Sequence, residues 1–171
     1  VITVVFNARP LLPATAASVL AQRGVRFEYL VIDGGSTDGT VEWLEGLARS
    51  SPRVRVVSGP DRGIYDAMNK GLRLARGAWV SYMNAGDRFL AEDSLALLRE
   101  RAEGFDGAWG DVEVRWAAGL AVFRAARAKM NSAGVGRATP MRTATAAPIT
   151  ASAEMAMISF FIASIFCSSN F

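Results

Sequence analysis

Short apolar runs alternate with segments in which apolar residues recur every three or four positions over residues 1–114. β-Branched and aromatic runs predict buried strands, and the helical spacing predicts amphipathic helices. This alternation predicts an α/β fold, a doubly wound and mostly parallel sheet with helices on both faces. The expected strands are residues 1–6, 27–32, 54–57, 79–83 and 109–114, and the expected helices are residues 12–22, 41–49, 66–76 and 92–103.

The stretch at residues 30–40 is the one around which the rest is organised. An apolar strand ends on Asp33, a glycine-rich turn follows, and Thr37 and Asp38 precede the next helix. Ligands of open α/β sheets bind where strands end and helices begin, because helix N-termini favour anions. Asp33 is therefore a candidate ligand-binding carboxylate. The alternative is a tight turn in which Asp33 only accepts hydrogen bonds from its own backbone.

Polar side chains also follow the other predicted strands. Asn7 follows the first strand, Asp61 and Arg62 follow the third, and Asp87 follows the fourth. Because the carboxyl ends of parallel strands lie along one edge, we expect these groups to converge. One carboxylate can bind a nucleobase or ribose, another can hold a divalent metal, and Arg62 or Lys70 can neutralise phosphate. The pattern predicts a nucleoside diphosphate site with a metal.

Each of these residues also has a structural interpretation. Asp87 could be a turn residue or a helix N-cap, and Lys70 could lie on a solvated helix face. Asp66 could support the start of its helix through the helix dipole. The sequence leaves these alternatives open.

The composition excludes several kinds of catalytic and metal site and bears on the cellular compartment. The chain has no histidine, which excludes Ser-His-Asp and Cys-His nucleophiles and most zinc sites. Its one cysteine, Cys167, cannot form an internal disulfide, and residues 1–6 lack the charged start of a signal peptide. The net charge of +3 suits a phosphate-bearing ligand but does not require one. We expect a cytoplasmic protein without a nucleic-acid partner.

The composition changes after Glu113. Of the 16 acidic residues, only Glu154 lies beyond that point, and the tail is rich in Ala, Ser, Thr, Met and Arg. Residues 155–167 form an apolar run that is shorter than the roughly 18–20 residues needed to span a bilayer. We interpret residues 1–114 as one functional unit and residues 115–171 as an atypical tail, either frameshifted or disordered. The alternative is a helix that docks on a membrane surface or a partner.

Four ordered motifs carry a family resemblance: VVFNA at residues 4–8, IDGGSTDGT at 32–40, DRGIYDAMNKG at 61–71 and MNAGD at 83–87. Together they resemble family 2 glycosyltransferases of the GT-A fold, a Rossmann-like doubly wound sheet. They are most similar to bacterial enzymes that build exopolysaccharide, colanic-acid-type or O-antigen repeat units. The resemblance covers about residues 1–114 and implies a hexosyltransferase type of enzyme that transfers a sugar from a nucleotide diphosphate sugar to an acceptor hydroxyl with inversion.

The resemblance also implies roles for individual residues. Asp33 matches the aspartate that contacts the base, and Asp87 matches the last position of the metal-binding motif, where Asn84 and Gly86 take the earlier positions. The implied metal is Mn²⁺ or Mg²⁺. The positions expected to contact the nucleotide sugar are Phe6, Asn7, Ala8, Asp33, Asp61, Arg62, Lys70, Asn84, Ala85 and Asp111.

The acceptor half expected from the resemblance has no recognisable counterpart. The family's general base is an Asp or Glu downstream of the metal motif, and Glu154 matches no such motif. We therefore expect this chain to be a truncated form of such an enzyme that lacks the general base. The expected partners are a nucleotide diphosphate sugar and a saccharide or lipid-linked saccharide acceptor, with peripheral contact to the inner face of the plasma membrane.

Two other functions are alternatives to this one. A non-catalytic module that binds a nucleoside diphosphate would use the same residues, and its tail would contact a membrane or partner. A sugar-phosphate nucleotidylyltransferase is disfavoured, because residues 7–13 contain no glycine for a phosphate loop.

Overall fold

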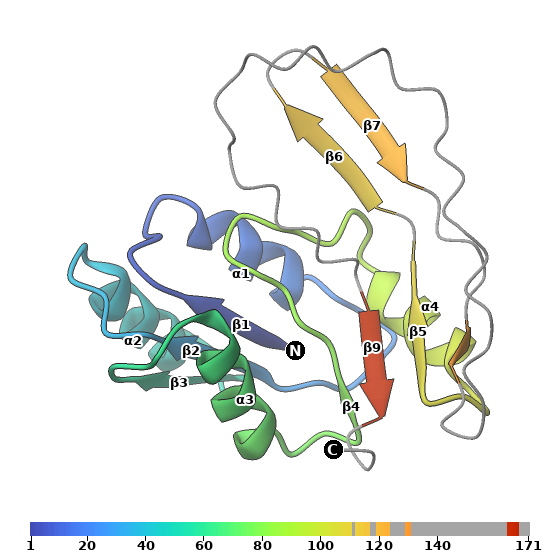
Figure 1. Cartoon of the computed structure of the whole chain (residues 1–171), viewed down its shortest axis with the longest axis horizontal. Helices are drawn as coiled ribbons and strands as arrows, with labels where there is room; N and C mark the ends of the chain where they lie inside the picture. The colour runs from blue at the N-terminus through green and yellow to red at the C-terminus, as the bar shows by residue number, and fades with distance from the viewer. Residues whose placement is uncertain (111, 117–118, 124–128, 131–163, 168–171) are drawn as a thin grey trace.

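A computed structural model describes residues 1–110, 112–116, 119–123, 129–130 and 164–167 (Figure 1). Its centre is a parallel sheet of β1 (Ile2–Val5), β2 (Tyr29–Asp33) and β3 (Val54–Ser58), in the order β1-β2-β3. The predicted parallel arrangement is therefore confirmed. Val5 is level with Asp33, and Asp33 with Ser58, so the three strands end together at one edge.

Beyond β1 the sheet continues through a parallel bridge between Ile2 and Tyr82 to strands that are antiparallel to one another. β1 lies beside the segment that begins with β4 (Trp79–Val80), because the Ile2 amide donates to the Ser81 carbonyl at 2.8 Å and the Met83 amide donates to the Ile2 carbonyl at 2.9 Å. Next come β9 (Ser164–Cys167), β5 (Gly107–Trp109) and β8 (Lys129–Met130), each antiparallel to its neighbour. The strands β6 (Val112–Trp116) and β7 (Gly119–Phe123) pair with each other.

Two predictions about strands and tail need correction. The single strand expected at residues 109–114 is two strands, β5 and β6, with Gly110 between them, and glycine weakens a strand interior. The helix interpretation of residues 155–167 is wrong for Ser164–Cys167, which form β9 between β4 and β5. A short apolar run fits a buried strand as well as a helix. Residues 155–163 lie outside the described residues, and the boundary at residue 114 stays a prediction.

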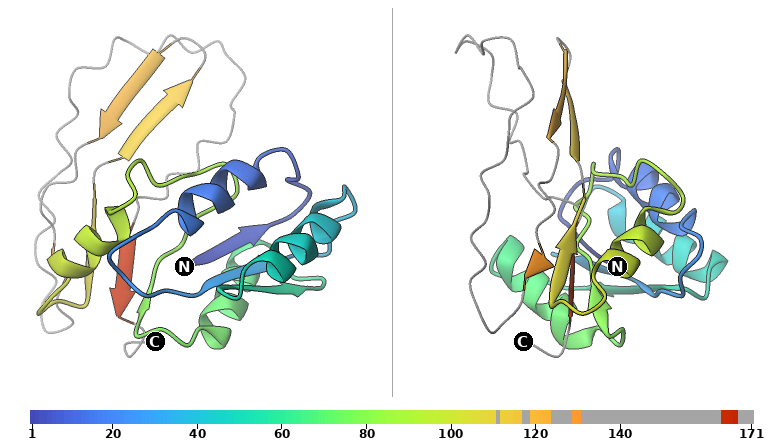
Figure 2. Two further views of the ribbon diagram at one scale, coloured as in Figure 1. Left: turned by 180° about the vertical axis from the view of Figure 1, so that it is seen from behind. Right: turned by 90° about the vertical axis from the view of Figure 1, so that its right-hand side faces the viewer.

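Helices cover both faces of the sheet, as the sequence predicts (Figure 2). Successive side chains of a strand point to opposite faces, so each buried strand supplies two cores. α1 (Leu12–Leu20), α2 (Thr40–Ser50) and α4 (Ser94–Arg101) pack on the face formed by Val5, Tyr29 and Val31. α3 (Ile64–Leu74) packs on the face formed by Ile2, Val4, Leu30 and Ile32. Among the described helices, none has the length and apolar character needed to cross a membrane.

Gly71 lets α3 approach the sheet closely. A Cβ atom at this position would lie 2.7 Å from Ile2 Cγ2 and 3.2 Å from Ile32 Cγ1. Both isoleucines are buried on central strands, so neither can move aside without disturbing the core.

We expect Gly71→Ala to lower the free energy of unfolding by about 1–3 kcal/mol, because overpacking outweighs the better helix propensity of alanine. Urea denaturation measures the change. The control is Gly46→Ala in α2, where the added Cβ meets only the far end of Arg49 at 4.0 Å. The overpacking argument fails if both variants are as stable as the wild type.

Candidate functional site

Asp33 lies at the carboxyl end of β2 and has no exposed surface. Its Oδ2 atom accepts hydrogen bonds from the Ser58 hydroxyl at 2.7 Å, the Gly35 amide at 2.9 Å and the Ser36 amide at 3.1 Å. Its Oδ1 atom is buried and has no hydrogen-bond partner in the described part of the chain. The tight-turn interpretation therefore accounts for one oxygen of Asp33 and leaves the other as a free acceptor.

The hydrogen bonds around Asp33 keep it ionised. Burial by itself would raise the pKa of this carboxyl group. The hydroxyls of Ser36 and Ser58 and the amides of Ser36 and Gly35 outweigh burial and hold the pKa below its ordinary value of 3.8. At neutral pH the site therefore presents a buried negative charge with one unused oxygen.

Hydrogen bonds connect the loop after β1 to the loop after β2. Asn7 Oδ1 accepts a hydrogen bond from the Thr37 amide at 2.8 Å, and the Asn7 amide donates to Ser36 Oγ at 2.8 Å. The Arg9 amide donates to Asp38 Oδ2 at 3.0 Å. Asn7 has a φ of 47°, a left-handed conformation that asparagine tolerates. Asn7 thus has a structural role, and its contact with a nucleotide stays a prediction.

A groove of about 460 Å³ opens beside these loops. Phe6, Gly34 and Asp61 line it, together with Gly63 and Ile64 at the start of α3. Gly34 lets Asp61 and Phe6 lie close to the β2 loop, because a Cβ there would lie 2.9 Å from Asp61 Oδ2 and 3.4 Å from Phe6 Cδ2. Phe6 is 63% exposed, which is unusual for a phenylalanine without a ligand. An exposed aromatic ring can stack on a planar base, and a carboxylate beside the ring can accept hydrogen bonds from the N–H groups of that base.

The basic residues lie around the start of α3. Asp66 Oδ2 accepts a hydrogen bond from the Arg62 amide at 3.0 Å, and the Arg62 guanidinium lies 3.8 Å from Asp66 Oδ1. That backbone hydrogen bond, with the positive charges nearby, holds the pKa of Asp66 below its ordinary value despite some desolvation. Asp66 therefore supports the helix start, as expected. Lys70 is half-buried, with Nζ 3.4 Å from the Pro60 carbonyl and 3.5 Å from the Gly59 carbonyl, and its contact with a ligand stays a prediction.

The Asn84–Asp87 turn follows β4. The Asp87 amide donates to the Asn84 carbonyl at 3.0 Å, and Gly86 between them has a left-handed φ of 102°. Asn84 is 7% exposed, and neither polar atom of its side chain has a hydrogen-bond partner among the described residues. The same holds for the buried Oδ2 of Asp87. The N-cap interpretation of Asp87 is wrong, because α4 begins at Ser94. The turn interpretation holds, but it leaves Oδ2 of Asp87 without a partner among the described residues.

Burial raises the pKa of Asp87 to about 6, and a backbone hydrogen bond from Asn84 offsets part of the shift. A carboxylate with one buried oxygen that has no partner gains from a nearby cation, and a neighbouring amide oxygen is a second hard donor. The residues present thus fit a divalent cation held by Asp87 and Asn84. No cluster of three or more acidic, cysteine or histidine side chains suited to a metal exists among the described residues, so further ligands would come from the diphosphate or water.

The raised pKa of Asp87 predicts a stability effect with a defined sign. Without metal, the ionised carboxylate destabilises the fold. This destabilisation is absent below the unfolded pKa of 3.8, grows as the pH rises, and is complete above about pH 6. We therefore expect Asp87→Asn to raise the free energy of unfolding at pH 7 and to leave it unchanged at about pH 3.5. Denaturant titrations at both pH values measure the difference. A variant less stable than the wild type at pH 7 would contradict the prediction.

The structure brings together only part of the predicted site. The loops after β1, β2 and β3 meet around Asp33 and the groove. The Asn84–Asp87 turn is instead hydrogen-bonded to α1, through the Gly86 amide and the Thr15 hydroxyl. Ala8 and Ala85 are half-buried against the core beneath these loops. Asp111 lies outside the described residues.

Sequence reasoning missed two parts of the Asp33 site. Ser58 donates a hydrogen bond to Asp33. This contact could have been predicted from the parallel register, which places Ser58 level with Asp33. The sequence predicts only a turn at Gly34, whereas its missing side chain keeps Asp61 and Phe6 close to the β2 loop. Both roles depend on neighbouring strands.

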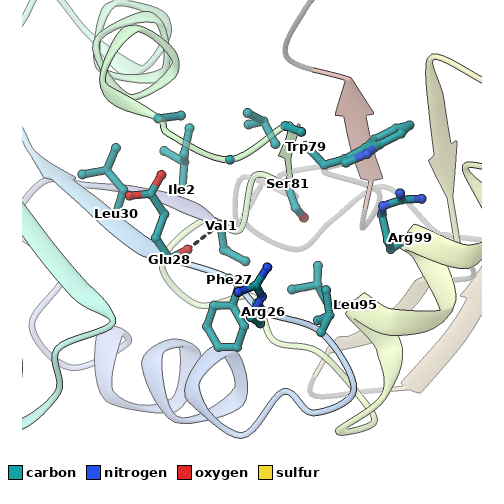
Figure 3. Close-up of a pocket in the computed structure, with 15 residues that line it drawn as sticks. Val1, Ile2, Arg26, Phe27, Glu28, Leu30, Trp79, Ser81, Leu95 and Arg99 are labelled. Atoms are coloured by element: carbon teal, nitrogen blue, oxygen red, sulfur yellow. Dashed lines mark hydrogen bonds between the residues drawn. The ribbon is translucent and has the colours of Figure 1, made fainter.

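A second cavity of about 210 Å³ lies at the opposite edge of the sheet (Figure 3). Its lining includes Val1, Glu28, Trp79, Ser81 and Arg99, and none of the predicted site residues. The Val1 amino group donates to the Glu28 carbonyl there at 2.8 Å. Because ligands of parallel sheets bind at the carboxyl ends of the strands, we place the functional site at the other edge.

The sequence also matches the model of a known family. The profile described as Glycosyl transferase family 2 matches residues 1–163. The chain belongs to glycosyl transferase family 2. The expectations of the family and of the GT-A fold are both confirmed.

Two curated relatives of this family 2 chain come from mycobacteria. A PGL/p-HBAD biosynthesis glycosyltransferase of Mycobacterium bovis (strain BCG / Pasteur 1173P2) is 35% identical over 113 residues, which are 64% of this chain and 44% of that protein. An uncharacterized glycosyltransferase of Mycobacterium tuberculosis (strain CDC 1551 / Oshkosh) is 39% identical over 121 residues, 70% of this chain and 44% of that protein. The family 2 chain thus spans less than half the length of these relatives.

Solved structures agree on the fold. A mannosyltransferase from Pyrobaculum calidifontis, in complex with GDP-Man and Mn²⁺, superposes with a TM-score of 0.60 at 29% identity, over 66% of this chain and 34% of that one. TarS of S. aureus, in complex with UDP-GlcNAc, superposes with a TM-score of 0.56 at 20% identity, over 62% of this chain and 32% of that one. At that identity, TarS shows the fold alone.

Proposed function

We propose that the chain is the nucleotide-sugar-binding half of an inverting, metal-dependent glycosyltransferase of the hexosyltransferase type. Its proposed donor is a nucleotide diphosphate sugar, and its acceptor is a saccharide or lipid-linked saccharide of bacterial surface polysaccharide synthesis. One observation carries the proposal: Asp33 and Asp87 each keep a buried carboxylate oxygen without a partner in the described chain, on loops at the carboxyl ends of family 2 strands. The mannosyltransferase in complex with GDP-Man and Mn²⁺ supports a nucleotide sugar and a divalent metal as the ligands.

The two carboxylates would serve different parts of the donor. Asp33 Oδ1 would accept a hydrogen bond from an N–H group of the base, while Phe6 stacks on the ring beside it. Asp87 and the amide oxygen of Asn84 would hold Mn²⁺ or Mg²⁺ against the diphosphate, with Arg62 and Lys70 adding positive charge. When bound, the cation would supply stabilisation of negative charge on the leaving diphosphate.

The chain's own residues account for donor binding and not for acceptor activation. An inverting transfer needs a base that removes the acceptor proton, and no described residue is assigned that role. Asp111, expected near the donor sugar, remains part of the proposal. The proposed location is the cytoplasm, at the inner face of the plasma membrane, where a lipid-linked acceptor would be presented.

Sugar transfer is the experiment that separates this proposal from its alternative, a nucleoside-diphosphate-binding module without catalysis. The chain is incubated with Mn²⁺, a panel of labelled nucleotide sugars and lipid-linked acceptors. Because no described residue is assigned as the base, we expect only slow transfer, to a product whose anomeric configuration, measured by NMR, is opposite to that of the donor. Retention of configuration would contradict the inverting mechanism. Donor binding without any transfer would favour the non-catalytic module.

A further inference from the structure

Three polar side chains of the α1 region hold the segment that follows β4. Thr15 Oγ1 accepts a hydrogen bond from the Gly86 amide at 2.9 Å, and Ser18 Oγ accepts one from the Phe89 amide at 3.2 Å. Gln22 Oε1 accepts one from the Leu95 amide at 2.8 Å. Their spacing of three and then four residues places them along one helix face.

Thr15 is the member of this set next to the Asn84–Asp87 turn. It is fully buried, and its partner Gly86 precedes Asp87 directly in the chain. Gly86 has the left-handed φ of 102°, and the turn around it closes through the Asp87 amide and the Asn84 carbonyl. The central amide of the turn is therefore fixed to a buried side chain of another element.

The same helix is also fixed at the Asp33 side. The loop that leads into α1 bears Asn7 and Arg9, which are hydrogen-bonded to Thr37 and Asp38 in the loop after Asp33. One path from one predicted binding carboxylate to the other thus runs through the β1 loop, α1 and the Thr15 hydrogen bond, beside the path through β1 itself, where Met83 donates to Ile2.

We propose that Thr15 is a positioning residue that sets the place of Asp87 relative to the nucleotide-binding loops. The Thr15 hydroxyl fixes the Gly86 amide, and this fixes the direction in which the Asp87 carboxylate leaves the turn. The inference rests on the proposed function, in which Asp87 holds the metal. Thr15 itself touches neither metal nor donor.

Thr15→Val tests the inference, because it keeps the shape of the side chain and removes the acceptor. We expect the gain in nucleoside diphosphate affinity caused by Mn²⁺ to fall about tenfold or more, as for other outer-shell partners of metal ligands. Affinity without metal should stay unchanged. Thr15→Ser keeps the acceptor and should restore the metal gain. UDP, GDP and dTDP, titrated by calorimetry with and without Mn²⁺, give both affinities.

The matched control is Thr3→Val. Thr3 is also fully buried and also accepts a hydrogen bond, from the Tyr29 hydroxyl at 3.1 Å, but it lies within β1. We expect this variant to lower stability and to leave the metal gain intact. An equal loss of metal gain in both Thr→Val variants would overturn the inference, since the effect would then be a general loss of stability. An unchanged metal gain in Thr15→Val would overturn it as well.

Hydrogen exchange of the Gly86 amide, followed by NMR, separates this inference from the proposed function. The exchange should be faster in Thr15→Val than in the wild type and Thr15→Ser, whether or not any nucleotide binds. If no nucleoside diphosphate binds to the wild type, the proposed function fails, and this exchange rate still decides whether Thr15 anchors the turn. Equal Gly86 exchange rates in wild type and Thr15→Val would refute the anchor.

Discussion

Asp87→Ala is expected to abolish the gain in UDP, GDP or dTDP affinity that Mn²⁺ or Mg²⁺ provides. Asp87 Oδ2 is buried without a partner in the described chain, and the neighbouring Asn84 offers only an uncharged oxygen. Loss of a direct carboxylate ligand should cost at least the roughly 10- to 100-fold in metal affinity that loss of an outer-shell partner costs. Affinity without metal should change little, because the base is bound elsewhere. Isothermal titration with and without metal measures both.

The control for this prediction is Asp93→Ala. Asp93 is an exposed carboxylate in the same connection between β4 and α4, and it makes no side-chain capping hydrogen bond. Its removal changes the net charge by the same amount as the removal of Asp87. If both variants lose the metal gain equally, the effect is one of overall charge, and the assignment of Asp87 is wrong.

Asp33→Ala is expected to cost about 3 kcal/mol or more of the free energy of unfolding, because it leaves three donors without their acceptor. These donors are the Ser58 hydroxyl and the amides of Gly35 and Ser36. Asp33→Asn should cost less, since its amide oxygen can face the donors. Its NH₂ group would then occupy the place of Oδ1, where the base is expected to donate. We therefore expect the Asp33→Asn variant to retain most of the fold and to lose nucleotide binding.

The contribution of Asp33 should also depend on pH with a definite sign. Its pKa is lower in the folded protein than the ordinary 3.8, so its stabilisation is complete above that value. The stabilisation is lost as the pH falls through the folded pKa. Urea denaturation of wild type and Asp33→Asn from about pH 7 to about pH 2.5 measures this difference. Ser58→Ala, which removes one donor and leaves Oδ1 in place, is the control for binding. Wild-type affinity in Asp33→Asn would contradict the assignment.

The first three strands and the helices could be predicted because their sequences reflect local patterns. Tyr29, Val31, Leu30 and Ile32 are buried on two faces, which makes β2 a continuous apolar run that ends at a buried charge. The predicted helix at residues 41–49 is observed at Thr40–Ser50, because its apolar spacing and the preceding Asp38 are local signals. Fold and family could therefore be predicted from the sequence.

The remaining features depend on contacts between distant segments. β9 forms only because β4 and β5 supply pairing partners on both sides, and nothing within residues 164–167 specifies them. In the sequence, Thr15 is indistinguishable from any other helix residue, and only the structure shows its hydrogen bond with the Gly86 amide. The sequence identified Asp33 and Asp87 as candidates, but it could not show which of their oxygens are already occupied.

The most direct test of the central claim is calorimetric titration of the whole chain with UDP, GDP and dTDP, each with and without Mn²⁺. We predict that at least one of them binds, that Mn²⁺ tightens its binding, and that Asp87→Ala removes this gain. Absence of binding by all three would contradict a donor-binding role. Binding that is independent of metal in both the wild type and Asp87→Ala would contradict the metal site.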